Sequence, residues 1–143
     1  MPVLVSSCLL GVVCRYDGNH SLAQEIVQKA RHMHVIPICP EQLGGLPTPR
    51  PPSLIVHGDG EGVLRGRARV INDRGEDVTR EFLKGAHQAL ALARLMGARR
   101  AFLKAKSPSC GLRTPYCETD SGYGIGVTAA LLLQNGIVVV EVS

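Results

Sequence analysis

Five cysteines are the residues of this sequence with the most evident capacity for chemistry. They are Cys8, Cys14, Cys39, Cys110 and Cys117, in a chain of 143 residues. The N-terminus lacks the basic region of a signal peptide, so we expect a cytoplasmic protein. In a reducing compartment, grouped cysteines indicate metal binding or catalysis rather than disulfides.

Three of the cysteines follow short apolar runs that we predict to be strands. Because the carboxyl ends of parallel strands meet at one edge of a sheet, we expect these three thiols to converge there. The runs and their cysteines are Val3–Val5 with Cys8, His34–Ile38 with Cys39, and Ala101–Leu103 with Cys110.

Three converging thiols predict a metal centre with an open position. A structural zinc site takes four ligands, usually with two in a tight local pair, and no Cys-x-x-Cys pair is present. An iron–sulfur cluster is normally held by four cysteines, so with three one iron is free to bind a substrate atom. The alternative is that the thiols are small buried apolar residues. Either Cys14 or Cys117 could supply a fourth ligand or receive sulfur, but we interpret both as bystanders.

The elements that would position the cysteines alternate between strand and helix. This order predicts a single α/β domain over residues 1–143, with three layers: a mostly parallel, Rossmann-like sheet with helices on both faces. The other expected elements are a helix of about eleven residues capped by Ser21, a helix over Arg80–Met96 capped by Asp77 or Thr79 and ended by Gly97, a helix over Thr128–Gln134, and a strand over Ile137–Val142.

Two further segments are expected outside these units. The stretch Gly44–Gly60 is rich in glycine and proline and predicts a fixed loop, while Val63–Asn72 predicts a hairpin or edge strand before the turn Asp73–Gly75. Pro37 favours an edge position or a bulge for its strand, because proline cannot donate to the ladder.

The composition of the chain argues against two classes of binding partner, nucleic acids and membranes. The formal net charge is +4 and aromatic residues make up 3% of the chain, with no tryptophan. Stacking platforms for single-stranded nucleic acid are therefore scarce, and we expect no nucleic-acid partner. No apolar run is long enough to span a bilayer, so we expect no membrane partner either. The five histidines show no metal-type pairing and are interpreted as surface or packing residues.

Three ordered motifs together resemble the DUF523 family, which includes thiouracil desulfidases. The resemblance runs over essentially the whole chain, although the segment Tyr116–Gly122 and the Ser53 that follows the paired prolines depart from the family pattern. The motifs are Ser7–Gly11 with Cys14–Gly18, Cys39–Leu46 with Pro49 and Arg50, and Lys106–Gly111.

The resemblance implies a [4Fe-4S] cluster held by Cys8, Cys39 and Cys110. It also implies removal of sulfur from a small-molecule thiolated pyrimidine such as 2-thiouracil, giving uracil and hydrogen sulfide. A carboxylate and a serine that the family uses near the cluster correspond to Glu41 and Ser107.

The residue types agree with such a reaction. Glu41 would act as the general base for water, and Ser107 would orient the water or the pyrimidine, with loop capping as the alternative role for each. Lys104 and Lys106 could balance the charge of a thiolate-bound cluster, although Lys104 is interpreted as a solvated surface charge. Arg50 could clamp a carbonyl or a phosphate.

Two other functions compete with the desulfidase. One is a non-catalytic protein that binds zinc or an iron–sulfur cluster through its thiolates. The other is a sulfur carrier that holds a persulfide on a free cysteine.

Overall fold

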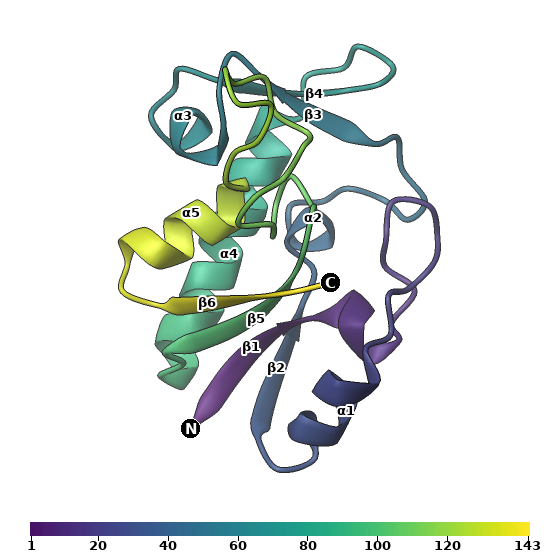
Figure 1. Cartoon of the computed structure of the whole chain (residues 1–143), viewed down its shortest axis with the longest axis vertical. Coiled ribbons are helices and arrows are strands. Elements are labelled where there is room, and N and C mark those ends of the chain that lie inside the picture. Colours follow the sequence, from purple (N-terminus) through teal and green to yellow (C-terminus); the bar gives the residue numbers. More distant parts are fainter.

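Four parallel strands form the central sheet, with the strand that opens the chain in its interior (Figure 1). The computed structural model describes all 143 residues. The sheet order is β2-β1-β5-β6, so the direction in which strands are added reverses between β1 and β5. In open parallel sheets, a ligand crevice opens beside such a reversal, outside the carboxyl ends of the strands. The four strands are β1 (Pro2–Ser6), β2 (His34–Ile38), β5 (Arg100–Lys104) and β6 (Val138–Val142).

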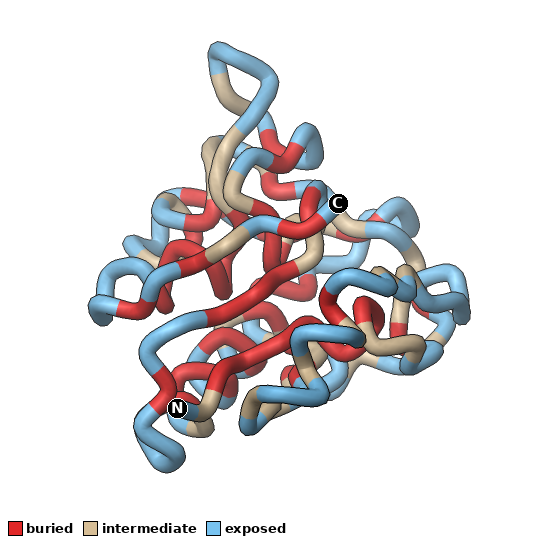
Figure 2. Tube along the Cα trace, turned by 60° about the horizontal axis from the view of Figure 1, so that its bottom comes forward, coloured by how far each residue is buried: buried red, intermediate tan, exposed pale blue.

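Helices cover both faces of the sheet, which confirms the predicted α/β architecture. Leu4 packs with Phe82 in the larger core, whereas Val5, the next residue along β1, packs with Ile26 in a smaller one. Successive residues of a strand point to opposite faces, so one apolar run fills both cores. Figure 2 shows the buried residues running along the central strands. The covering helices are α1 (Gln24–Ala30) on one face, and α4 (Thr79–Met96) and α5 (Val127–Gln134) on the other.

A second, antiparallel pair of strands lies beside this sheet. Of the hairpin or edge strand predicted over Val63–Asn72, only Arg69–Asn72 is a strand. Its partner, Ser53–Val56, lies within the stretch for which the sequence predicted only a loop. Its register runs from Ser53 opposite Asn72 to Val56 opposite Arg69. The remaining elements are β3 (Ser53–Val56), β4 (Arg69–Asn72), α3 (Gly60–Leu64) between them, the short α2 (Pro40–Leu43) and the 3₁₀ helix η1 (Ser7–Leu10).

The helix ends differ in detail from their predicted caps. Helix α1 begins at Gln24 and has no side-chain cap. Ser21 lies upstream of it, and its hydroxyl accepts a hydrogen bond from Arg15 Nη1 at 2.9 Å. Asp77 accepts from the backbone N–H of Thr79, the first residue of α4, at 2.9 Å. Gly97 ends α4 in the left-handed conformation, at φ 71°, as predicted.

Two glycines bring α2 into direct contact with α4. A Cβ at Gly85 would overlap the carbonyl oxygen of Pro40, and one at Gly44 would overlap that of Glu81. Glycine weakens a helix interior by about 1 kcal/mol relative to alanine, so its position at 85 is explained by this close approach. The contact fixes the short helix that directly follows Cys39.

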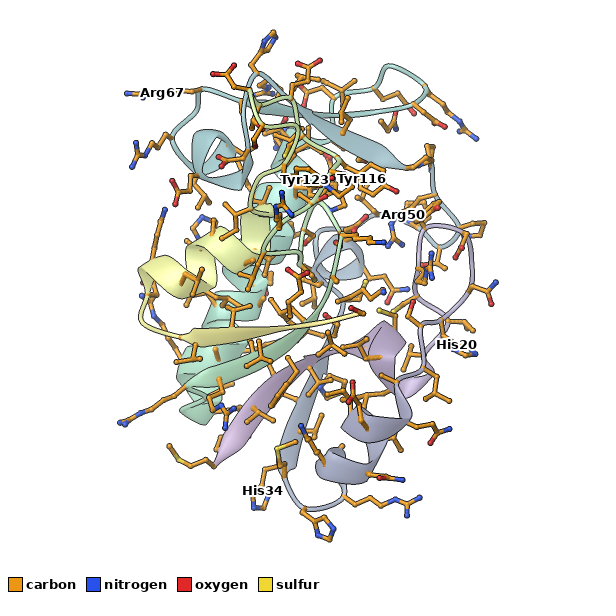
Figure 3. The ribbon with its side chains drawn as sticks, viewed as in Figure 1. His20, His34, Arg50, Arg67, Tyr116 and Tyr123 are labelled. Atoms are coloured by element: carbon orange, nitrogen blue, oxygen red, sulfur yellow. The ribbon has the colours of Figure 1, made fainter.

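Pro37 lies in β2, an edge strand of the sheet, as predicted. All five histidines are exposed, and His20 and His34 are seen at the periphery in Figure 3. No helix is both long and apolar enough to cross a membrane.

Candidate active site

A cavity of about 410 Å³ opens at the carboxyl ends of β1, β2 and β5. It lies where the strand order reverses, as expected for a parallel sheet. The structure brings the five site residues predicted from the sequence to its wall, together with Cys14. Those five are Cys8, Cys39, Glu41, Ser107 and Cys110.

Cys8 is held in the turn that directly follows β1. The chain enters the 3₁₀ helix η1 there, and Gly11 ends it at φ 92°, donating its backbone N–H toward the carbonyls of Ser7 and Cys8. The Ser6 hydroxyl accepts a hydrogen bond from the backbone N–H of Lys104 at 2.9 Å. This bond ties the end of β1 to the end of β5, so the segments that carry Cys8 and Cys110 leave the sheet side by side.

Cys39 occupies the N-cap position of α2. Its carbonyl accepts from the backbone N–H of Leu43 at 2.9 Å. Pro40 fills the first helical position, where a missing N–H costs nothing. Glu41 follows in the first turn, so one short helix sets the distance between the thiol and the carboxylate.

Cys110 lies in a loop that Ser107 organises. The Ser107 hydroxyl oxygen accepts from the backbone N–H groups of Ser109 and Cys110, each at 3.0 Å. The carbonyl of Ser109 in turn accepts from the N–H of Thr128, in the first turn of α5, at 2.9 Å. Ser107 therefore has the loop-capping role, and its own hydroxyl proton is still available to a group in the cavity.

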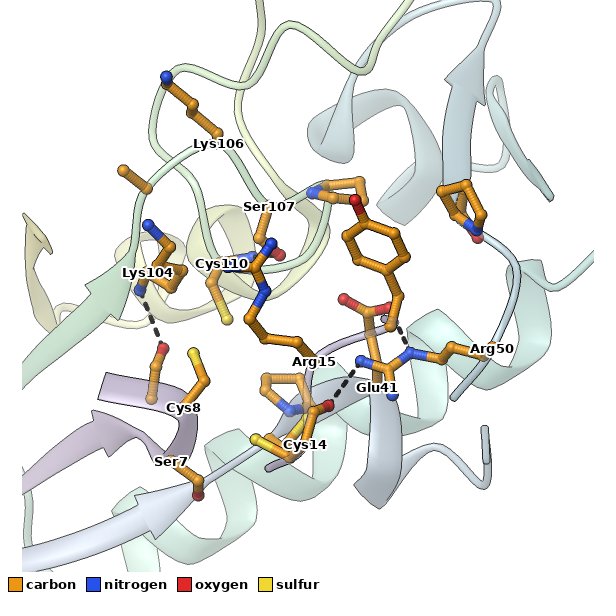
Figure 4. A pocket seen from close by; sticks show the side chains of 18 of the residues that line it. Ser7, Cys8, Cys14, Arg15, Glu41, Arg50, Lys104, Lys106, Ser107 and Cys110 are labelled. Atoms are coloured by element: carbon orange, nitrogen blue, oxygen red, sulfur yellow. Dashed lines mark hydrogen bonds and ion pairs between the residues drawn. The ribbon is translucent and has the colours of Figure 1, made fainter. Parts of the chain in front are cut away.

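Figure 4 shows the sulfurs of Cys8 and Cys110 pointing toward the same space. Burial, together with the nearby charges of Cys39 and Glu41, raises the pKa of Cys110 to about 12. None of the five cysteines forms a disulfide.

Cys14 lies among the other thiols of the cavity. The Cys39 thiol is 3.7 Å from the Cys14 carbonyl oxygen. A hydrogen bond with Cys14 lowers the pKa of Cys8, against the effect of burial, and a hydrogen bond with Cys14 raises the pKa of Cys39 well above its usual range. The pKa of Cys14 itself is about 11, because the bond with Cys39, which lowers it, is outweighed by the bond with Cys8 and by burial.

The thiols line the cavity but form no ready-made metal site. No three histidine, cysteine, aspartate or glutamate side chains are grouped so as to hold a metal ion. A single zinc ion needs thiolates about 2.3 Å from one centre, so the arrangement presents no preformed zinc site. Free thiols that come from three strand ends and line one cavity are the type of donor that holds iron–sulfur clusters.

Several wall residues carry positive charge or an aromatic ring. Lys104 lines the cavity and is only partly exposed. Lys106 and Arg15 line it as well. Two of the chain's three tyrosines, Tyr16 and Tyr116, are also on the wall.

The sequence analysis did not predict the two tyrosines as site residues, although both lie in segments named with the family resemblance. Tyr16 belongs to the first motif, and Tyr116 begins a segment that departs from the family pattern. In a chain with five aromatic residues, two of them Phe82 and Phe102 in the cores, the exposed tyrosines are the signal that could have been followed.

The remaining cysteine and two polar side chains of the motifs have local roles. The Cys117 thiol donates to the carbonyl of Thr114 at 3.3 Å. The Ser109 hydroxyl is 2.9 Å from that of Thr128, which explains its burial. Asp17 caps its own turn by accepting from the N–H of Asn19 at 3.0 Å.

Arg50 does line the cavity, but its guanidinium clamps groups of the protein. Its Nε donates to Glu41 Oε1 at 3.0 Å, within an ion pair that is almost wholly buried. Its Nη2 donates to the backbone carbonyl of Cys14 at 3.0 Å, so the donors expected to clamp a carbonyl or a phosphate of a ligand are directed at the protein itself.

Known proteins match this chain over nearly its full length. A family model described as 2-thiouracil desulfurase matches residues 3–143. The uncharacterized protein YbbK of Bacillus subtilis is 45% identical over 142 residues, which cover 97% of this chain and 94% of that protein. A solved structure named [4Fe-4S]-dependent thiouracil desulfidase TudS is 39% identical, with a TM-score of 0.80, and the match covers 98% of this chain and 89% of that one.

Proposed function

Because the chain belongs to the 2-thiouracil desulfurase family, we propose that it is a [4Fe-4S]-dependent desulfidase that converts a thiolated pyrimidine such as 2-thiouracil to uracil and hydrogen sulfide. The net reaction exchanges the thiocarbonyl sulfur for the oxygen of one water molecule, so it needs no oxidant or reductant. The observation that carries the proposal is the sharing of one cavity by three free thiols from three strand ends and a carboxylate. The cofactor named for TudS supports it.

Cys8, Cys39 and Cys110 are the proposed ligands. When bound, the cluster would supply an iron without a protein ligand, a Lewis acid suited to a soft thiocarbonyl sulfur. Three thiolates bring negative charge into a partly enclosed space. Lys104 and Arg15, both on the wall, offset that charge.

Glu41 is the proposed general base. Its carboxylate is held on the wall by Arg50 and can take a proton from a water that attacks the thiocarbonyl carbon. The Ser107 hydroxyl accepts two backbone bonds and can donate its proton to that water or to the pyrimidine ring. The two side chains therefore divide the work into proton removal and orientation.

The test is anaerobic reconstitution followed by sulfide-release assays on thiolated bases and their nucleotides, with the oxygen analogues as blanks. We expect brown protein with about four irons per chain, as a [4Fe-4S] cluster requires, and sulfide together with the matching oxygenated pyrimidine. Iron-loaded protein that releases no sulfide from any of these compounds would refute the proposed activity. Colourless protein with bound zinc would favour the metal-binding alternative, and persulfide without iron would favour the sulfur carrier.

A further inference from the structure

The buried guanidinium of Arg50 joins three segments of the cavity wall. Its side chain is 4% exposed, and Figure 4 shows it bonded to Glu41 on one side and to the Cys14 carbonyl on the other. These two bonds are both 3.0 Å long. A third nitrogen, Nη1, donates to the Pro47 carbonyl at 3.2 Å and to the Thr48 hydroxyl at 3.1 Å. One side chain thus connects α2, the segment around Cys14 and its own loop.

This arrangement leaves half of the Glu41 carboxylate free. Oε1 accepts the bond from Arg50, and Glu41 makes no other side-chain hydrogen bond. Every buried side-chain oxygen or nitrogen in the molecule has a hydrogen-bond partner. Oε2 has none, so it is not buried. Because Glu41 lines the cavity and its side chain is 15% exposed, Oε2 is available there.

We propose that Arg50 is a positioning residue, which acts through Glu41 by fixing the carboxylate so that its free oxygen faces the substrate. The role rests on the proposed desulfidase function. The backbone of Arg50 supports this positioning role. Its N–H donates to the Tyr16 carbonyl at 2.8 Å and so anchors the residue independently of its side chain.

Arginine is specifically suited to this position. A guanidinium is planar and presents its donors in a rigid fork, whereas a lysine ammonium is a compact charge on a flexible stem. Lysine at position 50 would keep the positive charge but could not bond Glu41, Cys14, Pro47 and Thr48 in their present directions. Arg50→Lys therefore separates the geometry of the clamp from its charge.

The first measurement is steady-state sulfide release by Arg50→Lys, with Arg69→Lys as a matched control. Arg69 also pairs with a carboxylate, Asp77, at 2.8 Å, but on the exposed surface beside β4. A displacement of about 1 Å in a reacting group can cost about 100-fold in rate. We expect Arg50→Lys to lower kcat by about 10- to 100-fold with a much smaller change in KM, and Arg69→Lys to leave both unchanged.

The second measurement repeats Arg50→Lys in a Glu41→Gln background. If Arg50 acts through Glu41, the lysine variant should lower kcat no more than about twofold further once the base is gone. An equal loss in both backgrounds would overturn the proposal, because Arg50 would then act on the reaction by some other route. Unchanged kcat for Arg50→Lys in the native background would also overturn it.

The third measurement does not depend on activity. Thermal unfolding midpoints of the two single variants, the double variant and the parent, taken without cluster or substrate, report the coupling between the two side chains. We expect the sum of the midpoint losses of the two single variants to exceed the midpoint loss of the double variant. Additive losses would mean that the two side chains are not coupled. A parent protein that releases no sulfide refutes the proposed function, whereas this cycle still tests the contact.

Discussion

Replacing Glu41 by glutamine removes a proton acceptor from the cavity and preserves the size of the side chain. The amide oxygen of glutamine can still accept the bond from Arg50 Nε, which is 3.0 Å long in the structure. Arg50 also keeps its bonds to the Cys14 carbonyl and to the Pro47–Thr48 segment. The variant therefore changes the chemistry of the site with little change in its shape.

The expected loss in turnover follows from the role of a general base. Such a group contributes about 10²- to 10⁴-fold, equivalent to about 2.7–5.4 kcal/mol in the barrier. Stability should fall much less, by about 1–2 kcal/mol, because a charged hydrogen bond to a nearly buried guanidinium becomes a neutral one. Substrate binding and cluster content should be retained.

The assay is sulfide release at saturating substrate, with iron per chain and visible absorbance measured on the same samples. Glu25→Gln is the control, since Glu25 is an exposed carboxylate in the first turn of α1. A loss of only a few-fold in Glu41→Gln with the iron intact would refute the reasoning and turn attention to Ser107 or bulk water. Loss of iron would instead show that Glu41 maintains the segment that carries Cys39.

Three other variants test separate parts of the account. Cys14→Ser should keep its iron, because the three proposed ligands leave the open position that the chemistry needs; loss of iron would make Cys14 a ligand. A Gly-to-Ala change would ordinarily stabilise a helix by about 1 kcal/mol. Gly85→Ala should instead destabilise this protein by about 1–3 kcal/mol in urea unfolding, because the new Cβ overlaps the Pro40 carbonyl. The control Gln88→Ala, on the exposed side of α4, should be nearly neutral. Tyr116→Ala should raise KM by about 5- to 150-fold with kcat little changed, as removal of a stacking face worth about 1–3 kcal/mol would do, whereas Tyr116→Phe should resemble the parent.

The elements of the central sheet were predictable because their signals are local. The continuous apolar runs of β1, β5 and β6 are typical of strands buried on both faces, and the long helix before β5 carries a clear apolar face and a terminal glycine. Strand β3 was missed because Ser53–Val56 directly follows two prolines in a glycine-rich stretch. Its partner is β4, so what stabilises β3 is pairing with a segment that comes later in the chain.

The same distinction holds for the site. The convergence of the segments that carry Cys8, Cys39 and Cys110 followed from one rule, that parallel strands end at a common edge. The partnership of Arg50 with Glu41 and the Cys14 carbonyl could not be predicted in that way, because it depends on how two irregular loops fold back on α2. The cap assigned to Ser21 was wrong for a related reason, since Arg15 takes its hydroxyl.

The central claim is that Cys8, Cys39 and Cys110 hold the cluster, and iron content tests it most directly. Each is replaced by alanine in turn, with Cys117→Ala as a control for a buried thiol that does not line the cavity, and iron per chain is measured after anaerobic reconstitution. We expect the three cavity variants to lose their iron and the Cys117 variant to load like the parent. Full iron and normal sulfide release in Cys39→Ala would contradict the account.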